Sequence, residues 1–127
     1  MAETLPGRKN REIALVDAVN LIGLKTCDTC RKARTALETA GATVIFRDVR
    51  ADPPRRDELE DWLHGFGEAL VNRRSTTWRG LAPAEREASP LDLLLTHPTL
   101  MKRPLLIRGT RRHLGWDREA MAALGLG

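Results

Sequence analysis

The sequence is poor in the residues from which metal and nucleic-acid sites are commonly built. Its 127 residues include only two cysteines, three histidines, two phenylalanines and no tyrosine. Because the chain has no further cysteine and His64, His97 and His113 are widely separated, it lacks the ligand spacing of a zinc site. The aromatic share of 4% argues against the stacking surfaces with which proteins bind nucleic-acid bases.

Long apolar runs are also missing. No run approaches the ~20 residues of a membrane-spanning helix, and the N-terminus shows no apolar core of a signal peptide. We therefore expect a cytoplasmic protein without a membrane partner. In the cytoplasm a Cys-x-x-Cys pair is reduced at rest and is more often redox-active than structural.

Charge is plentiful but mixed. The net charge of +4 arises from 21 lysines and arginines against 17 acidic residues. Most arginines are interleaved with acids, as in Arg55-Arg56-Asp57-Glu58, which is typical of a solvated helix face. We therefore expect no nucleic-acid partner, and favour a small anionic ligand that a local cluster of arginines would bind. The length predicts a single domain, which we expect to be a monomer.

The two cysteines lie at a predicted turn from a strand to a helix. The short apolar run from Val19 to Leu24 predicts a buried strand, and a helical spacing of apolar residues follows Cys30: Ala33, Ala36, Leu37 and Ala40. Backbone N–H groups at a helix start lack intrahelical partners and favour a thiolate. Such surroundings lower a cysteine pKa from about 8.5 to roughly 3.5–7.5. Our leading hypothesis is therefore a nucleophilic Cys27.

A simpler interpretation stays open beside that hypothesis. Free cysteine is among the most buried residue types, so both cysteines could be small core residues without reactivity. This interpretation suits Cys30, one turn into the predicted helix, better than it suits Cys27.

The rest of the chain predicts one α/β layer domain over residues 19–127, preceded by a partly disordered N-terminal extension over residues 1–18. A β-branched run predicts a second strand from Thr43 to Val49. Asp52-Pro-Pro predicts the cap of a second helix with proline at its first position. Further helices should follow, and then a strand at residues 103–107 that turns back into another.

Three stretches in this order resemble the arsenate reductase ArsC/Spx family, which includes a YffB-like branch. They are Gly23-Leu-Lys-Thr-Cys-Asp-Thr-Cys-Arg-Lys-Ala33, Leu70-Val-Asn-Arg-Arg-Ser-Thr-Thr-Trp-Arg79 and His97-Pro-Thr-Leu-Met-Lys-Arg-Pro-Leu-Leu106. The resemblance covers residues 19 to about 124. It implies a thioredoxin-like fold, with a small mixed sheet flanked by helices and a helical insertion between the second and third strands.

The resemblance also implies a set of site residues. Cys27 would be the nucleophile, with Arg103 beside it and Pro104 as a cis-proline. An arginine of the Asn72-Arg73-Arg74 segment would bind the substrate, and we favour Arg74 over Arg73. Cys30 would complete the Cys-x-x-Cys pair that is a feature of the Spx branch, and would resolve an adduct on Cys27.

One departure from the arsenate-reducing pattern directs the prediction. Those enzymes carry another arginine after the Arg-Pro strand, whereas this chain has His113-Leu-Gly-Trp116, and Arg111 and Arg112 come too early for that role. The ending resembles the YffB-like branch.

We therefore predict a cysteine-dependent thiol/disulfide oxidoreductase that acts on arsenate or a glutathione mixed disulfide. It would hold no metal or bound cofactor, and glutathione with glutaredoxin, or thioredoxin, would supply electrons. The alternative is an Spx-type redox-sensing transcription regulator that binds RNA polymerase through a Cys27–Cys30 disulfide switch.

Overall fold

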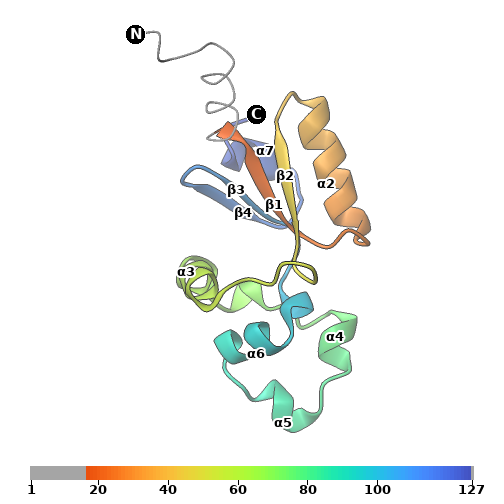
Figure 1. Ribbon diagram of the computed structural model, residues 1–127, viewed down its shortest axis with the longest axis vertical. Coiled ribbons are helices and arrows are strands. Elements are labelled where there is room, and N and C mark those ends of the chain that lie inside the picture. The colour runs from red at the N-terminus through yellow and green to blue at the C-terminus, as the bar shows by residue number, and fades with distance from the viewer. Residues whose placement is uncertain (1–16, 127) are drawn as a thin grey trace.

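A four-stranded mixed sheet forms the centre of the protein. The computed structural model describes residues 17–126, so the predicted extension over residues 1–18 lies almost wholly outside the described residues. The strands β1 (Val19–Gly23), β2 (Val44–Asp48), β3 (Leu105–Arg108) and β4 (Arg111–Leu114) are arranged in the order β2-β1-β3-β4 (Figure 1). β1 pairs parallel with β2 and antiparallel with β3, and β3 pairs antiparallel with β4. The predicted small mixed sheet is confirmed.

Helices α2 (Asp28–Thr39) and α7 (Ala120–Ala123) pack on one face of this sheet (Figure 1). Because side chains alternate along a strand, Val19 and Leu21 of β1 both point to that face. They form a buried cluster with residues of both helices and of β3: Cys30, Ala33, Leu37, Leu106, Ala120 and Leu124. Ala33 and Leu37 of the predicted apolar face therefore meet the sheet, whereas Ala40, which was predicted to lie on that face, is exposed at the C-cap of α2.

The opposite face of the sheet meets α3 (Arg56–Phe66) and a group of short helices. These are η1 (Gly67–Leu70), α4 (Thr76–Arg79), α5 (Pro83–Arg86), α6 (Pro90–Thr96) and η2 (Pro98–Leu100). Ile22 and Leu105 belong to the larger core cluster on this side, together with Leu59 and Trp62 of α3. Figure 1 shows these helices gathered below the sheet. The predicted helical insertion between the second and third strands is confirmed.

The predicted start of the second helix was wrong. That helix, α3, begins at Arg56 rather than at the proline after Asp52. The Arg47 guanidinium donates to the carbonyl oxygens of Asp52 and Pro53, at 3.1 and 2.9 Å, and so holds this segment outside the helix. Glu58 caps the helix instead, because its carboxylate accepts the Arg55 N–H at 2.9 Å.

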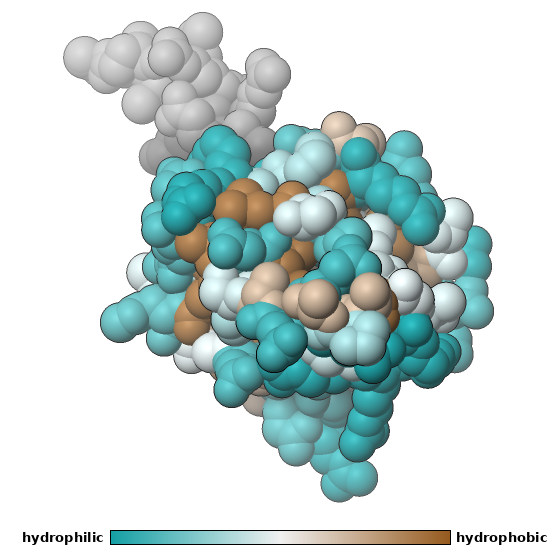
Figure 2. Space-filling model, turned by 90° about the horizontal axis from the view of Figure 1, so that it is seen from below, coloured by the Kyte–Doolittle hydropathy of each residue, from teal (hydrophilic) through white to brown (hydrophobic). Residues whose placement is uncertain are grey.

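The surface is mostly hydrophilic. Seen from the side of the insertion, apolar surface is interrupted by hydrophilic side chains (Figure 2). Among the described residues, the large hydrophobic side chains that are exposed are Ile45 and Leu95. Within residues 17–126, no helix is both long enough and apolar enough to cross a membrane.

Neighbouring leucines of α6 provide a matched test of the packing. Leu94 is fully buried in the larger core cluster, whereas Leu95 is 37% exposed. We expect Leu94→Ala to lower the free energy of unfolding by about 2–5 kcal/mol, because it removes buried methyl groups and leaves a cavity. Leu95→Ala should lower it by under about 1 kcal/mol. Urea unfolding followed by circular dichroism measures both, and equal losses would contradict the placement of α6.

Candidate active site

Cys27 occupies the N-cap position of α2, as the sequence predicted. Its backbone is extended, with φ −84° and ψ 119°, and its N–H donates to the Leu24 carbonyl at 3.1 Å. The Cys27 side chain is half-buried and contacts both core clusters, so its sulfur lies at their common boundary. Both cysteines are free thiols, and Cys30 lies one turn into the helix with no exposed surface.

The surroundings of Cys27 favour its thiolate. Burial raises the pKa of Cys27, but hydrogen bonds from the Cys30 N–H and thiol, together with the charge and a hydrogen bond of Arg103, outweigh burial and lower that pKa. The position of Cys27 at the start of α2 matters because the Cys30 N–H is one of the free donors of a first helical turn. The sulfur is therefore both activated and accessible.

Cys30 has the opposite character. Burial, above all, and the neighbouring Cys27 thiolate raise the pKa of Cys30 to about 12, although the Leu24 N–H donates to its sulfur. Cys30 therefore stays protonated at neutral pH and can donate its proton to the Cys27 sulfur. The interpretation of a cysteine as a small core residue fits the surroundings of Cys30 but not those of Cys27.

Arg103 is held beside Cys27 by the insertion. Its guanidinium donates to the Thr99 carbonyl at 2.7 Å, and this contact fixes a side chain that would otherwise be free to rotate. Thr99 is in turn tied to α4, because its hydroxyl lies 2.9 Å from that of Thr77. The peptide bond between Arg103 and Pro104 is cis, as the resemblance implied, and Pro104 is buried. The structure thus brings Cys27, Cys30 and Arg103 together.

Arg73 and Arg74 have different surroundings. They line an open concavity with Lys102, Asn72, Val71 and Ala69. Arg73 pairs with Glu68 at 2.8 Å and lies 5.3 Å from the centre of the Trp78 ring. Arg103 is among the main groups that lower the pKa of Cys27, and neither Arg73 nor Arg74 is among them. Their role in substrate binding stays a prediction.

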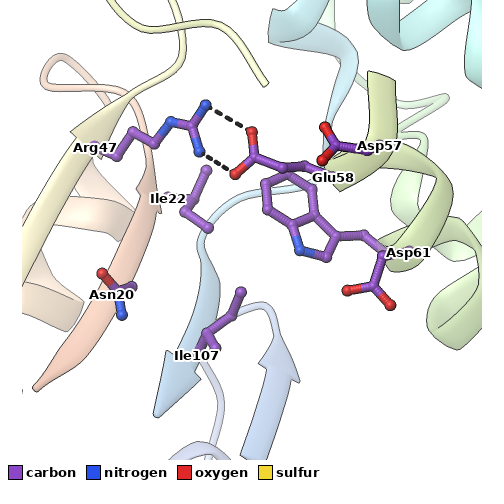
Figure 3. A pocket seen from close by; sticks show the side chains of 8 residues that line it. Asn20, Ile22, Arg47, Asp57, Glu58, Asp61 and Ile107 are labelled. Atoms are coloured by element: carbon purple, nitrogen blue, oxygen red, sulfur yellow. Dashed lines mark hydrogen bonds and ion pairs between the residues drawn. The ribbon is translucent and has the colours of Figure 1, made fainter. Parts of the chain in front are cut away.

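A separate pocket of about 390 Å³ lies between the sheet and α3 (Figure 3). The side chains around it are Asn20, Ile22, Arg47, Asp57, Glu58, Asp61, Trp62 and Ile107, and they include no cysteine. Its charges are already paired: Arg47 binds Glu58 through two contacts of 2.7 and 3.0 Å, and Asp61 pairs with Arg112. These ion pairs connect the sheet to α3 at the pocket, and Arg112 is held by Asp61 of α3.

Two residues that shape the site were missed by the sequence reasoning. Gly23 ends β1, and a Cβ at this position would overlap the Cys30 sulfur. Asp48 ends β2, and its carboxylate accepts the Lys25 N–H at 2.9 Å. The available signal was the predicted order strand, helix, strand over residues 19–49, because two strands joined by a helix usually pair parallel and their carboxyl ends then meet at one edge of a sheet.

No three or more His, Cys, Asp or Glu side chains of the described residues are arranged to hold a metal ion.

The fold and the site together define a thioredoxin-like α/β protein with a Cys-x-x-Cys pair at the start of its first described long helix. The chain belongs to the ArsC family, whose family model matches residues 22–124.

Relatives within this family carry different names. The chain is 31% identical over 110 residues to an uncharacterized protein of Haemophilus influenzae, covering 83% of this chain and 96% of that protein. It is 29% identical to the global transcriptional regulator Spx of Bacillus subtilis, covering 80% of this chain and 82% of Spx. A solved structure of a YFFB protein matches with a TM-score of 0.76 and 34% identity, covering 84% and 98% of the two chains. An arsenate reductase (ArsC) related protein from Brucella melitensis matches with a TM-score of 0.67 and 32% identity, covering 83% and 92%.

The two thiols should differ sharply in reactivity. We expect iodoacetamide to alkylate Cys27 with a pH midpoint below about 8.5, the ordinary cysteine value. Cys30 should stay unmodified in the folded protein, since its pKa is raised to about 12 and its sulfur is buried. Mass spectrometry of peptides gives the midpoint for each cysteine, and alkylation in urea, where both should react, is the control. Equal reactivity in the folded protein would contradict this division.

The contact of Gly23 with Cys30 can be tested by a double-mutant cycle. We expect Gly23→Ala to lower the free energy of unfolding by about 1–3 kcal/mol, because the added methyl group must displace the Cys30 sulfur. In a Cys30→Ala background the same change should cost clearly less, since the sulfur is gone. Urea unfolding of the four proteins supplies the numbers, and strict additivity would show that the two residues do not touch.

Proposed function

We propose that this protein is a cysteine-dependent thiol/disulfide oxidoreductase that reduces glutathione mixed disulfides. The observation that supports this most is the pairing of an activated Cys27 with an arginine that the insertion holds in place. A thiolate nucleophile and a fixed cation are the two components that attack on a negatively charged disulfide requires.

The proposed reaction has two thiol exchanges. The Cys27 thiolate attacks the glutathione sulfur of a mixed disulfide, a new S–S bond forms, and the substrate leaves as a thiolate that takes up a proton. The Cys30 sulfur then attacks Cys27, and glutathione leaves with the proton that Cys30 loses. The product is a Cys27–Cys30 disulfide, which two electrons from glutaredoxin, thioredoxin or glutathione would return to two thiols.

The surroundings of Cys30 make its step the slower one. In the adduct Cys27 carries no negative charge, so one of the causes that raise the pKa of Cys30 disappears. Burial of Cys30 remains, and it keeps the thiolate fraction small. A second glutathione molecule would therefore compete with Cys30 for the adduct.

The small number of arginines near Cys27 favours a glutathione mixed disulfide over arsenate as the substrate. Arg103 is the cation that acts on the Cys27 thiol, and Arg112 is engaged with Asp61. An arsenate dianion has more charge to neutralise next to the sulfur, whereas the carboxylates of a glutathione adduct are spread along a peptide. Arg74 would receive such a distant carboxylate, because the neighbouring Arg73 already pairs with Glu68. We expect the reaction to take place in the cytoplasm, in a monomer.

The second candidate is a redox-sensing regulator, favoured by the likeness to Bacillus subtilis Spx and by the two adjacent thiols. In that case the Cys27–Cys30 disulfide would alter a surface that binds RNA polymerase, and no substrate would be turned over.

A turnover assay separates these candidates. The protein is mixed with a glutathione mixed disulfide or with arsenate, and with glutathione and glutaredoxin or with thioredoxin, while NADPH use by the matching reductase is followed. We expect turnover of the mixed disulfide that Cys27→Ser abolishes and Cys30→Ser only reduces. Turnover of arsenate alone would exclude the preferred substrate. A disulfide that forms and is reduced without any turnover would support the regulator.

Arg103 should contribute more to turnover than any other described arginine. Arg103→Lys keeps a charge but loses the bidentate fork, which typically costs about 1.5–3 kcal/mol, or roughly a 10- to 150-fold lower kcat/KM. The pH midpoint for alkylation of Cys27 should also rise.

The basic residue next to Arg103 in the sequence is Lys102, but it lines the same concavity as Arg73 and Arg74 and so cannot serve as a control for this variant. Arg118→Lys, an exposed position after β4, is the matched control and should leave kcat/KM unchanged. Unchanged turnover and an unchanged alkylation midpoint in Arg103→Lys would place the anion site elsewhere.

A further inference from the structure

Asp48 connects the two loops that leave the carboxyl ends of β1 and β2. Its Oδ2 accepts the Lys25 N–H at 2.9 Å, and its Oδ1 accepts the Arg50 N–H at 2.7 Å. Lys25 belongs to the loop before Cys27, and Arg50 belongs to the loop before α3. The pKa of the Asp48 carboxyl is lowered, mainly by the bond from Lys25, so the group is ionised at neutral pH. One carboxylate thus holds both loops.

The Lys25 end of this contact leads directly to both sulfurs. Leu24, the residue before Lys25, donates its N–H to the Cys30 sulfur and accepts the Cys27 N–H on its carbonyl at 3.1 Å. Gly23, one residue earlier, lies against the Cys30 sulfur. A shift of Lys25 would therefore displace the peptide groups that set the distance between the two cysteines.

The other side of Asp48 is rigid. Asp48 and Arg47 are consecutive residues of a strand, so their side chains leave on opposite faces. The Arg47 guanidinium binds the Glu58 carboxylate of α3 (Figure 3). It also donates to the Asp52 and Pro53 carbonyls, which fixes the loop on the side of α3. The end of β2 that carries Asp48 is therefore fixed against α3. The hydrogen bond from the Lys25 N–H to Asp48 fixes the cysteine loop to this strand end.

We propose that Asp48 is a positioning residue for the cysteine pair: its carboxylate fixes the Lys25 peptide, and thereby holds the Cys30 N–H and thiol in hydrogen-bonding range of the Cys27 sulfur. Asp48 touches neither sulfur and acts through Leu24 and Lys25. The proposal deepens the proposed function, on which it rests, because it names the residue that maintains the activated state of Cys27.

Charge and position predict opposite effects, which makes the proposal testable. Asp48→Asn removes a negative charge near Cys27, and this alone would lower the pKa of Cys27. The amide nitrogen of asparagine is a donor, so only one of the Lys25 and Arg50 N–H groups would keep an acceptor. If Asp48 positions the loop, the loss of hydrogen bonds to the Cys27 thiolate outweighs the lost charge, and the pKa of Cys27 rises.

The experiment measures the alkylation midpoint of Cys27 in the full chain. We expect an upward shift of roughly half a pH unit or more in Asp48→Asn. Asp52→Asn is the matched control, because Asp52 lies in the same loop, is 72% exposed and pairs with Arg47 at 3.2 Å without reaching the cysteine loop. Its midpoint should stay the same or fall slightly. A midpoint in Asp48→Asn that is unchanged, or that falls as in the control, overturns the proposal.

If circular dichroism shows that Asp48→Asn does not fold, a second variant, Asp48→Glu, tests the proposal. Asp48→Glu keeps the charge and displaces the carboxylate by one methylene group, so the midpoint should again rise if position matters. A folded Asp48→Glu protein with an unchanged midpoint would overturn the proposal as well. The comparison needs no substrate: absence of turnover in the wild-type protein would count against the proposed function and leave the Asp48 test intact.

Discussion

The parallel pairing of β1 with β2 is the constraint on which the site depends. Parallel strands end at the same edge of a sheet, so the loop that carries the cysteines lies directly beside the loop that follows β2. Gly23 and Asp48 are partners in the register of the two strands. One of them leaves room for the Cys30 sulfur, and the other holds the peptide before Cys27. The start of α2 is thus defined by the sheet as well as by the helix.

The same geometry gives the two cysteines different roles. At the N-cap, Cys27 is close to free N–H donors and to the surface, whereas Cys30 points into the cluster between α2 and the sheet. Burial therefore acts fully on one sulfur and is outweighed on the other. A pair in which one thiol has a lowered pKa and the other a raised pKa suits a reaction in which the first sulfur attacks and the second follows.

The insertion contributes a cation without contributing a nucleophile. Its last short helix, η2, carries Thr99, whose carbonyl orients Arg103, and the hydroxyl contact to Thr77 ties that helix to α4. The proposed function therefore depends on α4 through two consecutive contacts, from Thr77 to Thr99 and from Thr99 to Arg103. Substitutions in the insertion can thus alter Cys27 through the placement of Arg103.

The sequence by itself determined the local features. Apolar spacing identified β1, α2 and β2, and the turn between strand and helix identified Cys27, because these signals lie within a few consecutive residues. It could not determine the start of α3, because that start depends on how Arg47 of β2 meets the Glu58 carboxylate of α3 and the carbonyls of Asp52 and Pro53. Only the tertiary structure decided how the pKa values of the two cysteines diverge, because burial of Cys30 and the charge of Arg103 depend on packing between distant segments.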